Sequence, residues 1–260
     1  MKSPLMQLLR DNAQREQKPL NLVRNAASPD STLFLYDVID AYWGISAQAV
    51  AAAVADADPK GTLHLRINSP GGDVFEARAM ATALREFGGN VVAHVDGLAA
   101  SAATTVACAA GEIVMGQGAF WMIHNAWSVA FGNKGDMLEM AALLAKIDGD
   151  IVADYAKCSG ADTAQVVAWM DAETWMTAEE AVTNGFADRL AVEPDGDEDG
   201  TDDDNDGDGK KAQAASRWNL AAYQRAPKQL IERPEPKPAT PDWAAIHANN
   251  ARRMRLLSIA

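Results

Sequence analysis

The sequence predicts an α/β domain in which strands and helices alternate around a largely parallel sheet. From residue 32 onward, short apolar runs typical of buried strands are separated by alanine-rich or amphipathic segments with helical spacing. This alternation argues for βαβ units. With 48% apolar residues in 260, the chain can bury a sizeable core.

The first half of the domain is predicted from four elements. An apolar strand over residues 32–39 precedes an alanine-rich helix that Ser46 caps. The strand LHLRIN at 63–68 leads into the loop NSPGG. An amphipathic helix over 73–87 follows, and two glycines stop it.

The second half continues the alternation. The apolar run NVVAHV at 90–95 predicts a buried strand, and further strands are expected at 112–116 and 120–124. A long helix is predicted from about residue 136 to 157, and a shorter one over 163–170. The order favours a single α/β domain.

A serine at the start of an alanine-rich helix is the first candidate for chemistry. In DGLAASAATTVACAA at 96–110, a strand-to-helix turn places Ser101 near a helix N-terminus. Unpaired N–H groups and the helix dipole favour negative charge there, which suits the oxyanion of acyl transfer. A lone serine at such a turn is more often only an N-cap, so other groups must decide.

Two further stretches supply those groups. The loop NSPGG at 68–72 places two glycines after a strand, so that bare backbone can approach a ligand. The apolar strand FWMIH at 120–124 ends in His124, the candidate base. A backbone donor, a nucleophile and a base thus follow one another along the chain.

With these motifs the sequence resembles the ClpP-type serine peptidases. NSPGG, GLAASAA and MIHN are similar to that family's oxyanion, nucleophile and histidine motifs, and the spacing from Gly72 to Ser101 (101 − 72 = 29) matches. The resemblance runs from about Leu33 to Val192. It is closer still to the ClpP-related head maturation (prohead) proteases of phages and prophages, through INSPGGDVFEA, the tryptophan of ETWMTAEEA and a dispensable-looking tail.

The resemblance implies a ClpP/crotonase-like βαβ superhelix. The long helix would project as a handle that pairs subunits in a homo-oligomeric ring, either a heptamer or a double ring. Its apolar positions repeat at helical spacing, but the same pattern fits a helix that packs on its own domain.

The resemblance also implies the catalytic residues. Ser101 is the nucleophile and His124 the general base and acid. The family's aspartate position is occupied by Glu173, 49 residues after His124 (173 − 124 = 49), and Asp171, on the same side of an expected strand, is the alternative. A Ser101–His124 dyad is the remaining option.

Backbone groups complete the implied site. The N–H groups of Gly72 and Ala102 would form the oxyanion hole, and Gly71 and Asn125 would bind substrate. No cofactor and no metal is implied.

Composition divides the chain into four parts. Residues 1–31 are expected to be a flexible arm, and 32–192 the peptidase domain. An acidic, disordered linker follows at 193–211, and a basic tail at 212–260 is proline-rich and extended over 226–241, with a short amphipathic helix near its end.

The net charge of −13 and the acidic body argue against nucleic acid as a partner. The linker contains a DxDxDG run from Asp202, but Gln213 stands where a calcium loop needs glutamate, so calcium binding is not expected. No apolar run is long enough to span a membrane and no signal peptide is visible, so a soluble cytoplasmic protein is expected, in the host cell and inside an assembling prohead.

Other reactive side chains receive structural interpretations. Cys108 and Cys158 are expected to pack as small apolar residues in a reducing compartment rather than to pair. His64 and His94 are interpreted as hydrogen-bonded core or interface histidines.

The expected function is therefore that of a ClpP-type serine endopeptidase that cleaves capsid or scaffold proteins during phage head maturation. Alternatives are a degradative peptidase working with a Clp ATPase and a catalytically idle assembly scaffold. Crotonase-like thioester chemistry and a serine–lysine mechanism fit the motifs less well. The tail is interpreted as a delivery segment that is self-cleaved.

Overall fold

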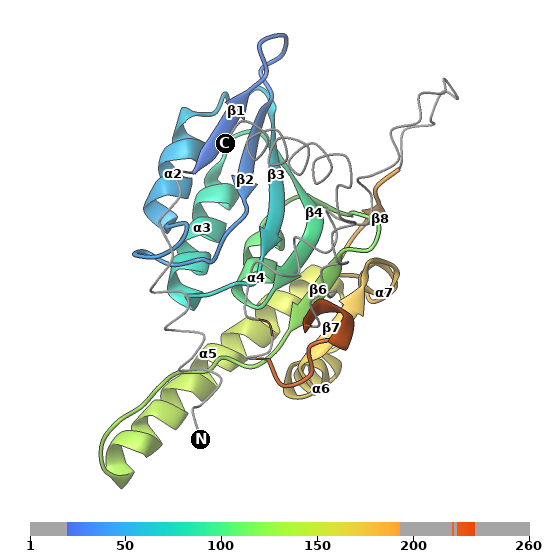
Figure 1. Ribbon diagram of the computed structural model, residues 1–260. Coiled ribbons are helices and arrows are strands. Elements are labelled where there is room, and N and C mark those ends of the chain that lie inside the picture. Colours follow the sequence, from blue (N-terminus) through green and yellow to red (C-terminus); the bar gives the residue numbers. More distant parts are fainter. Residues whose placement is uncertain (1–19, 193–219, 221–222, 232–260) are drawn as a thin grey trace, which may run out of the picture.

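The computed structural model describes residues 20–192, 220 and 223–231, and Figure 1 shows their arrangement. Their strands form one eight-stranded sheet, and the helices pack against it. Its main path runs through β1 (Asn21–Arg24), β2 (Ser31–Leu35), β3 (Thr62–Ser69), β4 (Asn90–Ala100), β5 (Glu112–Met115) and β8 (Arg189–Leu190). All neighbours from β2 to β8 on this path are parallel, which confirms the predicted sheet type.

Strand β4 is longer than the sequence predicts and changes partner along its length. Its first part pairs with β5 over Val92–Val95, and its last residues, Leu98–Ala100, pair in parallel with β6 (Phe120–Ile123). β6 pairs in turn antiparallel with β7 (Thr174–Thr177). The stretch GLAA, predicted as part of a turn, is therefore mostly strand, and the chain leaves the sheet only at Ser101.

Three helices cover one face of the sheet: α2 (Ala47–Asp56), α3 (Val74–Glu86) and α4 (Ala102–Ala107) (Figure 1). Ser46 and Asp73 cap the first two through their side chains, as the sequence indicates for Ser46. Alternate residues of β2 and β3 bury apolar side chains beneath these helices, because successive residues of a strand point to opposite faces. The buried set includes Leu33, Leu35, Leu63, Leu65, Ile67, Val50, Met80 and Leu84.

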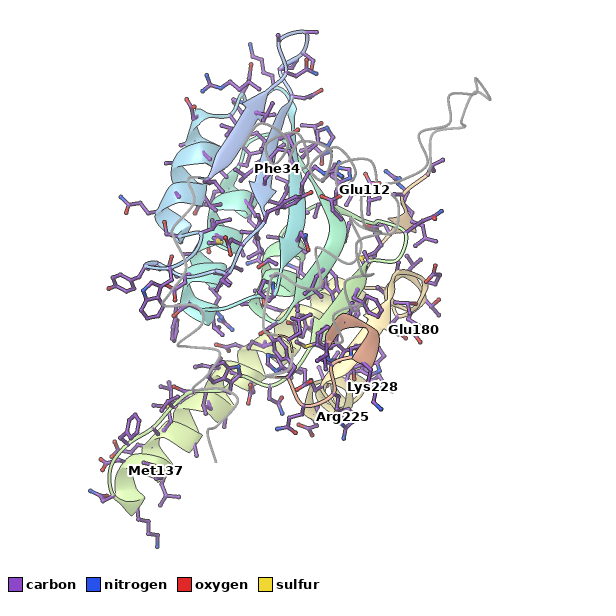
Figure 2. The ribbon with its side chains drawn as sticks, in the orientation of Figure 1. Phe34, Glu112, Met137, Glu180, Arg225 and Lys228 are labelled. Atoms are coloured by element: carbon purple, nitrogen blue, oxygen red, sulfur yellow. A yellow bond between two sulfur atoms is a disulfide. The ribbon has the colours of Figure 1, made fainter. Side chains whose placement is uncertain are left out.

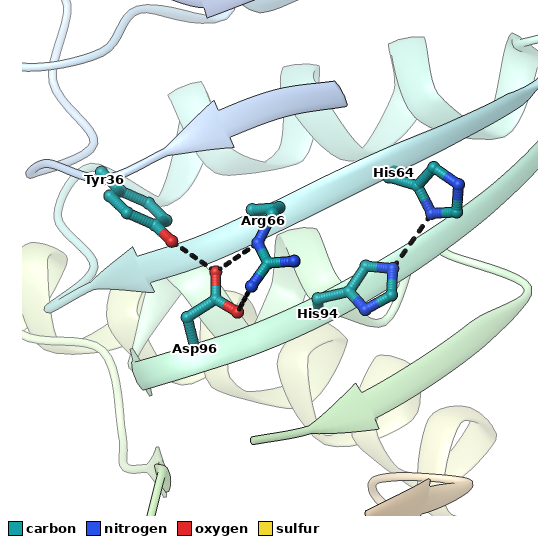
Figure 3. A network of polar contacts seen from close by, with 5 residues as sticks. All are labelled: Tyr36, His64, Arg66, His94 and Asp96. Carbon is teal, nitrogen blue, oxygen red and sulfur yellow. Dashed lines mark hydrogen bonds and ion pairs between the residues drawn. The ribbon is translucent and has the colours of Figure 1, made fainter. Parts of the chain in front are cut away.

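The other face of the sheet carries a polar row on β3, β4 and the residue that follows β2 (Figure 3). The Asp96 carboxylate accepts from the Tyr36 hydroxyl at 2.5 Å and from Arg66 Nε at 2.8 Å, and it also contacts the other arm of the guanidinium. His64 Nδ1 and His94 Nε2 lie 3.0 Å apart. The two histidines are thus hydrogen-bonded to each other on the sheet, as interpreted from the sequence.

Helix α5 (Lys134–Ser159) is the long helix that the sequence predicts. Its C-terminal half packs on the domain through Ile151 and Tyr155, which are buried. Its N-terminal half projects from the body, with Met137 at the far end (Figures 1 and 2). Helices α6 (Thr163–Asp171) and α7 (Ala178–Thr183) then flank β7.

The predicted boundary of the N-terminal arm is wrong for part of the range 1–31. Strand β1 lies within it, and Leu22 packs against the core. Its antiparallel pairing with β2 joins Leu22 to Leu33 and adds an edge strand to the sheet. Residues 1–19 lie outside the described residues, as do the acidic linker and the DxDxDG run.

The expectation of two unpaired thiols is also wrong. Cys108, directly after α4, and Cys158, in the last turn of α5, form a disulfide with their Cα atoms 5.6 Å apart. Fifty residues separate the two positions in sequence, so only the packing of α4 against α5 brings them together. The same packing of α4 on α5 brings Thr104 Oγ1 within 2.5 Å of the Tyr155 hydroxyl, a hydrogen-bond distance.

Part of the C-terminal tail packs on the domain. Leu220 is buried, and the short helix α9 (Lys228–Ile231) lies beside β7 (Figure 1). The predicted extended conformation over 226–241 is therefore wrong for residues 228–231; the expected helix near the end of the chain lies outside the described residues. No helix among the residues described is long and apolar enough to cross a membrane.

Candidate active site

The turn between β4 and α4 presents Ser101. Its backbone has φ 54° and ψ −127°, a conformation that a residue with a side chain adopts only under local constraint. The Ser101 N–H donates to Met122 O at 2.8 Å, which fixes the turn against β6. Although Ser101 occupies the N-cap position of α4, its side chain makes no capping hydrogen bond. The capping interpretation of this serine therefore fails.

The Ser101 hydroxyl instead meets His124. Ser101 Oγ lies 2.7 Å from His124 Nε2. The register explains the contact, because Ala100 pairs with Met122 and the next residues of both strands leave the sheet side by side. Burial lowers the pKa of His124 to about 4, against an opposing effect of the Glu173 carboxylate. At neutral pH the imidazole is therefore uncharged and able to accept a proton from Ser101.

The NSPGG loop lies against the Ser101 turn. Gly71 and Gly72 have φ values of 87° and 148°, which favour glycine. A Cβ atom on Gly71 would stand 2.5 Å from Ala100 O and 2.9 Å from Ala102 N, so the approach requires the absence of a side chain. Two backbone hydrogen bonds to Ile39, of 2.9 and 2.8 Å, hold the loop on either side of Gly72.

The two predicted oxyanion donors lie at this junction. Ala102 begins α4, and Gly72 follows the glycine that touches the Ser101 turn. Neither N–H has an acceptor within the part of the chain that the structure describes. Unpaired N–H groups beside a nucleophile are suited to bind the oxyanion of a tetrahedral intermediate.

Two residues that sequence reasoning missed support the turn from behind. Thr104 Oγ1 donates to Ser101 O at 2.5 Å, and the Tyr155 hydroxyl from α5 contacts Thr104 at 2.5 Å. Burial raises the pKa of Tyr155 to about 12, so the hydroxyl stays protonated. Thr104, three residues after Ser101, has the spacing of a local side-chain bond to the backbone, whereas nothing in the sequence signals Tyr155.

Glu173 lies next to His124 without a hydrogen bond between them. The antiparallel register of β6 and β7 ends at the pair Ile123–Thr174, and the next residues, His124 and Glu173, lie just outside it, where Glu173 has a φ of 46°. The Glu173 carboxylate is close enough to oppose the lowering of the pKa of His124. The Glu173 carboxylate accepts from Trp175 Nε1 at 3.3 Å and from the N–H groups of Gln224 and Arg225 at 2.9 and 2.7 Å.

Asp171 occupies a different place from the one predicted. It is the last residue of α6, and β7 begins only at Thr174, so the two acids do not share a strand face. The Asp171 carboxylate accepts from Asn125 Nδ2 at 2.7 Å. Asn125, the predicted substrate-binding residue after His124, is thereby tied to α6.

Tyr223, from the C-terminal tail, is a further residue at the site that sequence reasoning missed. Its ring lies edge-on to His124, with centroids 5.4 Å apart, and to Trp175, with centroids 5.7 Å apart. Its hydroxyl donates to Pro70 O at 2.7 Å. The tail is too distant in sequence for any local pattern to place it here.

Comparison with known proteins identifies the family of the chain. The family model of Clp protease matches residues 15–194, more than half of the chain. The chain belongs to the Clp protease family. Among its Clp relatives, the ATP-dependent Clp protease proteolytic subunit of Bacteroides fragilis is 28% identical over 183 residues, which cover 68% of this chain and 88% of the relative. That of Porphyromonas gingivalis is 27% identical over 67% of this chain and 82% of its own length.

A third relative, ATP-dependent Clp protease proteolytic subunit 3 of Rhodococcus jostii, is 28% identical over 61% of this chain and 80% of its own length. The part of the chain that matches the Clp family model contains Ser101, His124, Glu173 and the NSPGG loop, but not Leu220 or Tyr223. The tail contacts at the site are therefore an addition to the matched region.

Proposed function

We propose that this Clp family member is a serine endopeptidase. The observation that carries the proposal is the 2.7 Å contact between Ser101 Oγ and the Nε2 of a half-buried His124, made by a serine that does not cap its helix. Ser101 Oγ attacks the scissile carbonyl carbon, and His124 takes the hydroxyl proton. His124 then returns the proton to the leaving amine as the C–N bond breaks. In the second half of the reaction, His124 takes a proton from water, whose oxygen attacks the acyl carbon, and returns it to Ser101 Oγ as the ester C–O bond breaks.

The remaining roles follow from position. The N–H groups of Gly72 and Ala102 stabilise the oxyanion, and Gly71 and Asn125 lie where a peptide would bind beside them. Glu173 is the proposed orienting acid, because it lies beside His124 just outside the β6–β7 register. Asp171 is the weaker choice, since its carboxylate is engaged by Asn125.

The proposed substrates are capsid or scaffold proteins cleaved during phage head maturation, without ATP, in the host cytoplasm and inside the prohead. Support comes from the stretch INSPGGDVFEA, from Trp175 in ETWMTAEEA, and from a long C-terminal extension beyond the matched region. A homo-oligomeric ring is proposed as well. The projecting half of α5 exposes Met137, Leu138 and Leu143, an apolar surface suited to a second subunit.

A degradative peptidase that works with a Clp ATPase is the second candidate. It is favoured by the names of the relatives, which are ATP-dependent Clp protease proteolytic subunits. A catalytically idle assembly scaffold is the third, and the Ser101–His124 contact argues against it.

The purified chain tests these candidates directly. A fluorophosphonate probe should label Ser101 in the wild type and fail to label it in Ser101→Ala and His124→Ala. Cleavage of a capsid or scaffold protein without nucleotide would support the maturation protease, whereas degradation that requires a Clp ATPase and ATP would support the second candidate. Absence of labelling and of cleavage in every condition would leave the scaffold.

A further inference from the structure

Leu220 anchors the C-terminal tail in an apolar cluster beside the Ser101–His124 pair. Its side chain is 3% exposed and packs with Val38, Leu98, Ala100 and Met122. Leu98 and Ala100 belong to the end of β4 that leads into Ser101, and Met122 lies two residues before His124. The cluster is therefore made by the same strand ends that position the proposed nucleophile and base.

Tyr223 then covers His124. Its ring lies against the imidazole and Trp175, and its hydroxyl donates to Pro70 O in the NSPGG loop at 2.7 Å. Enclosure among these groups raises the pKa of Tyr223, so the hydroxyl remains a donor. One side chain of the tail thus touches both the histidine motif and the loop that carries the proposed oxyanion donor.

The next two residues engage the proposed orienting acid. The N–H groups of Gln224 and Arg225 donate to the two oxygens of Glu173, at 2.9 and 2.7 Å. Figure 2 shows Arg225 and Lys228 on the β7 side of the domain, where α9 continues the segment. Since Glu173 lies beside His124 just outside the strand register, these bonds hold its carboxylate toward the tail instead of toward the imidazole.

We propose that Leu220 and residues 223–231 form an inhibitory segment that closes the active site of its own chain, an inference that rests on the proposed peptidase function. The segment acts in two ways. Leu220 and Tyr223 occupy space that a peptide needs next to His124, and the backbone of Gln224 and Arg225 withdraws Glu173 from the catalytic group. Release of the segment opens the site and frees Glu173.

The contacts favour inhibition over presentation of the tail as a substrate. Within the residues described, the segment reaches the NSPGG loop through the Tyr223 hydroxyl rather than through backbone pairing. A scissile peptide must instead place its carbonyl between Ser101 Oγ and the oxyanion donors. Leu220 and residues 223–231 therefore block the site without offering Ser101 a peptide bond of their own.

The test compares full-length wild type with a released variant, Leu220→Asp with Tyr223→Ala. A buried aspartate among apolar side chains and the loss of the tyrosine ring should undock the segment. We expect the rate of Ser101 labelling by a fluorophosphonate to rise about tenfold or more, since 1.4 kcal/mol of lost docking energy already corresponds to a factor of ten. Hydrolysis of a short fluorogenic peptide should rise in parallel. Lys228→Ala, at an exposed position of α9, is the matched control and should behave as wild type.

Amide hydrogen exchange provides a readout that does not depend on activity. The Gln224 and Arg225 amides should exchange slowly in the wild type and in Lys228→Ala, and at the rate of an unprotected peptide in the released variant. Rapid exchange of both amides in the wild type would overturn the docking itself.

Two outcomes of the activity measurements distinguish inhibition by the tail from the proposed peptidase activity. Equal, measurable labelling of the wild type and the released variant, with the amides deprotected, would overturn inhibition and leave the peptidase intact. A folded released variant that neither labels nor cleaves would overturn the peptidase proposal, and the inhibition with it.

Discussion

Two sides of the proposed active site are positioned by different means. On one side, the parallel register of β4 and β6 delivers Ser101 and His124 to each other, and Thr104 with Tyr155 holds the turn from behind. On the other side, Glu173 lies just outside the β6–β7 ladder with a φ of 46°, and its carboxylate binds the tail. Backbone pairing fixes where a residue lies, but it does not determine which of several nearby groups the side chain hydrogen-bonds.

The largest effect on the rate of hydrolysis is expected from a substitution of Ser101, on the side that the β4–β6 register positions. Ser101→Ala should lower peptide hydrolysis by about 10⁶-fold, because removal of the nucleophile leaves only residual catalysis. The exposed Ser128→Ala is the control and should retain wild-type rates. Turnover of Ser101→Ala within tenfold of the wild type would remove Ser101 from the mechanism.

Glu173 should contribute to the rate of peptide hydrolysis once the tail is released from its carboxylate. In the released variant, Glu173→Gln should lower kcat by about 10⁴-fold if the carboxylate orients His124. Asp171→Asn should have a much smaller effect, because its carboxylate binds Asn125. Steady-state kinetics of both variants decide between the two acids, and the reverse order would assign the role to Asp171.

The disulfide lies behind the nucleophile side and should contribute stability rather than chemistry. Replacing Cys108 and Cys158 by serine opens a loop of 50 residues, which should lower the free energy of unfolding by about 4 kcal/mol. Denaturant unfolding measures this change, with reduced wild type as the comparison. Labelling of Ser101 in the folded variant should stay close to that of the wild type, and a large loss would show that α5 positions the site through this bond.

A side chain between the NSPGG loop and the Ser101 turn should disturb the site more than the fold. Gly71→Ala places a Cβ atom 2.5 Å from Ala100 O at a positive φ, so the loop must move. A shift near 1 Å should lower kcat/KM by about 10²-fold. Gly149→Ala, in α5 with no atom within 4 Å of the new Cβ, is the matched control and should stabilise the helix by up to about 1 kcal/mol.

The smallest effect concerns pH. Because the pKa of His124 is lowered to about 4, labelling of Ser101 should be constant from neutral pH down to about pH 5 and fall tenfold for each unit well below pH 4. In the released variant, loss of the Tyr223 cover should move the midpoint upward, toward the ordinary value of about 6.5. Identical profiles for the two proteins would show that the tail does not contribute to the burial of His124.

The sequence predicts the nucleophile side well because its signals are local. Alternating strands, an alanine-rich helix after Ser101 and a strand that ends at His124 suffice to place the pair, and the family's spacing adds Gly72. The same local signals predict the long helix to within two residues at either end. These features depend on periodicity and turn chemistry, which a single sequence displays.

The missed features are all products of tertiary packing. Cys108 and Cys158 meet because α4 crosses α5, and Tyr155 reaches Thr104 by the same contact. Asp171 was expected on a strand, yet α6 continues through it and changes the direction of its side chain. Leu220 and Tyr223 pack in an apolar cluster that forms only once β4, β6 and β7 are assembled.

That Leu220 and Ser101 belong to one polypeptide has a consequence for how the site can be opened. A tethered ligand acts at an effective concentration on the order of millimolar, whatever the total amount of protein. Dilution of the protein would therefore leave the active site covered. A peptide that competes from solution for the same place would have to be present at a comparable, millimolar concentration. Cleavage of one peptide bond between Ser101 and Leu220 would turn the inhibitory segment into an untethered ligand that can diffuse away.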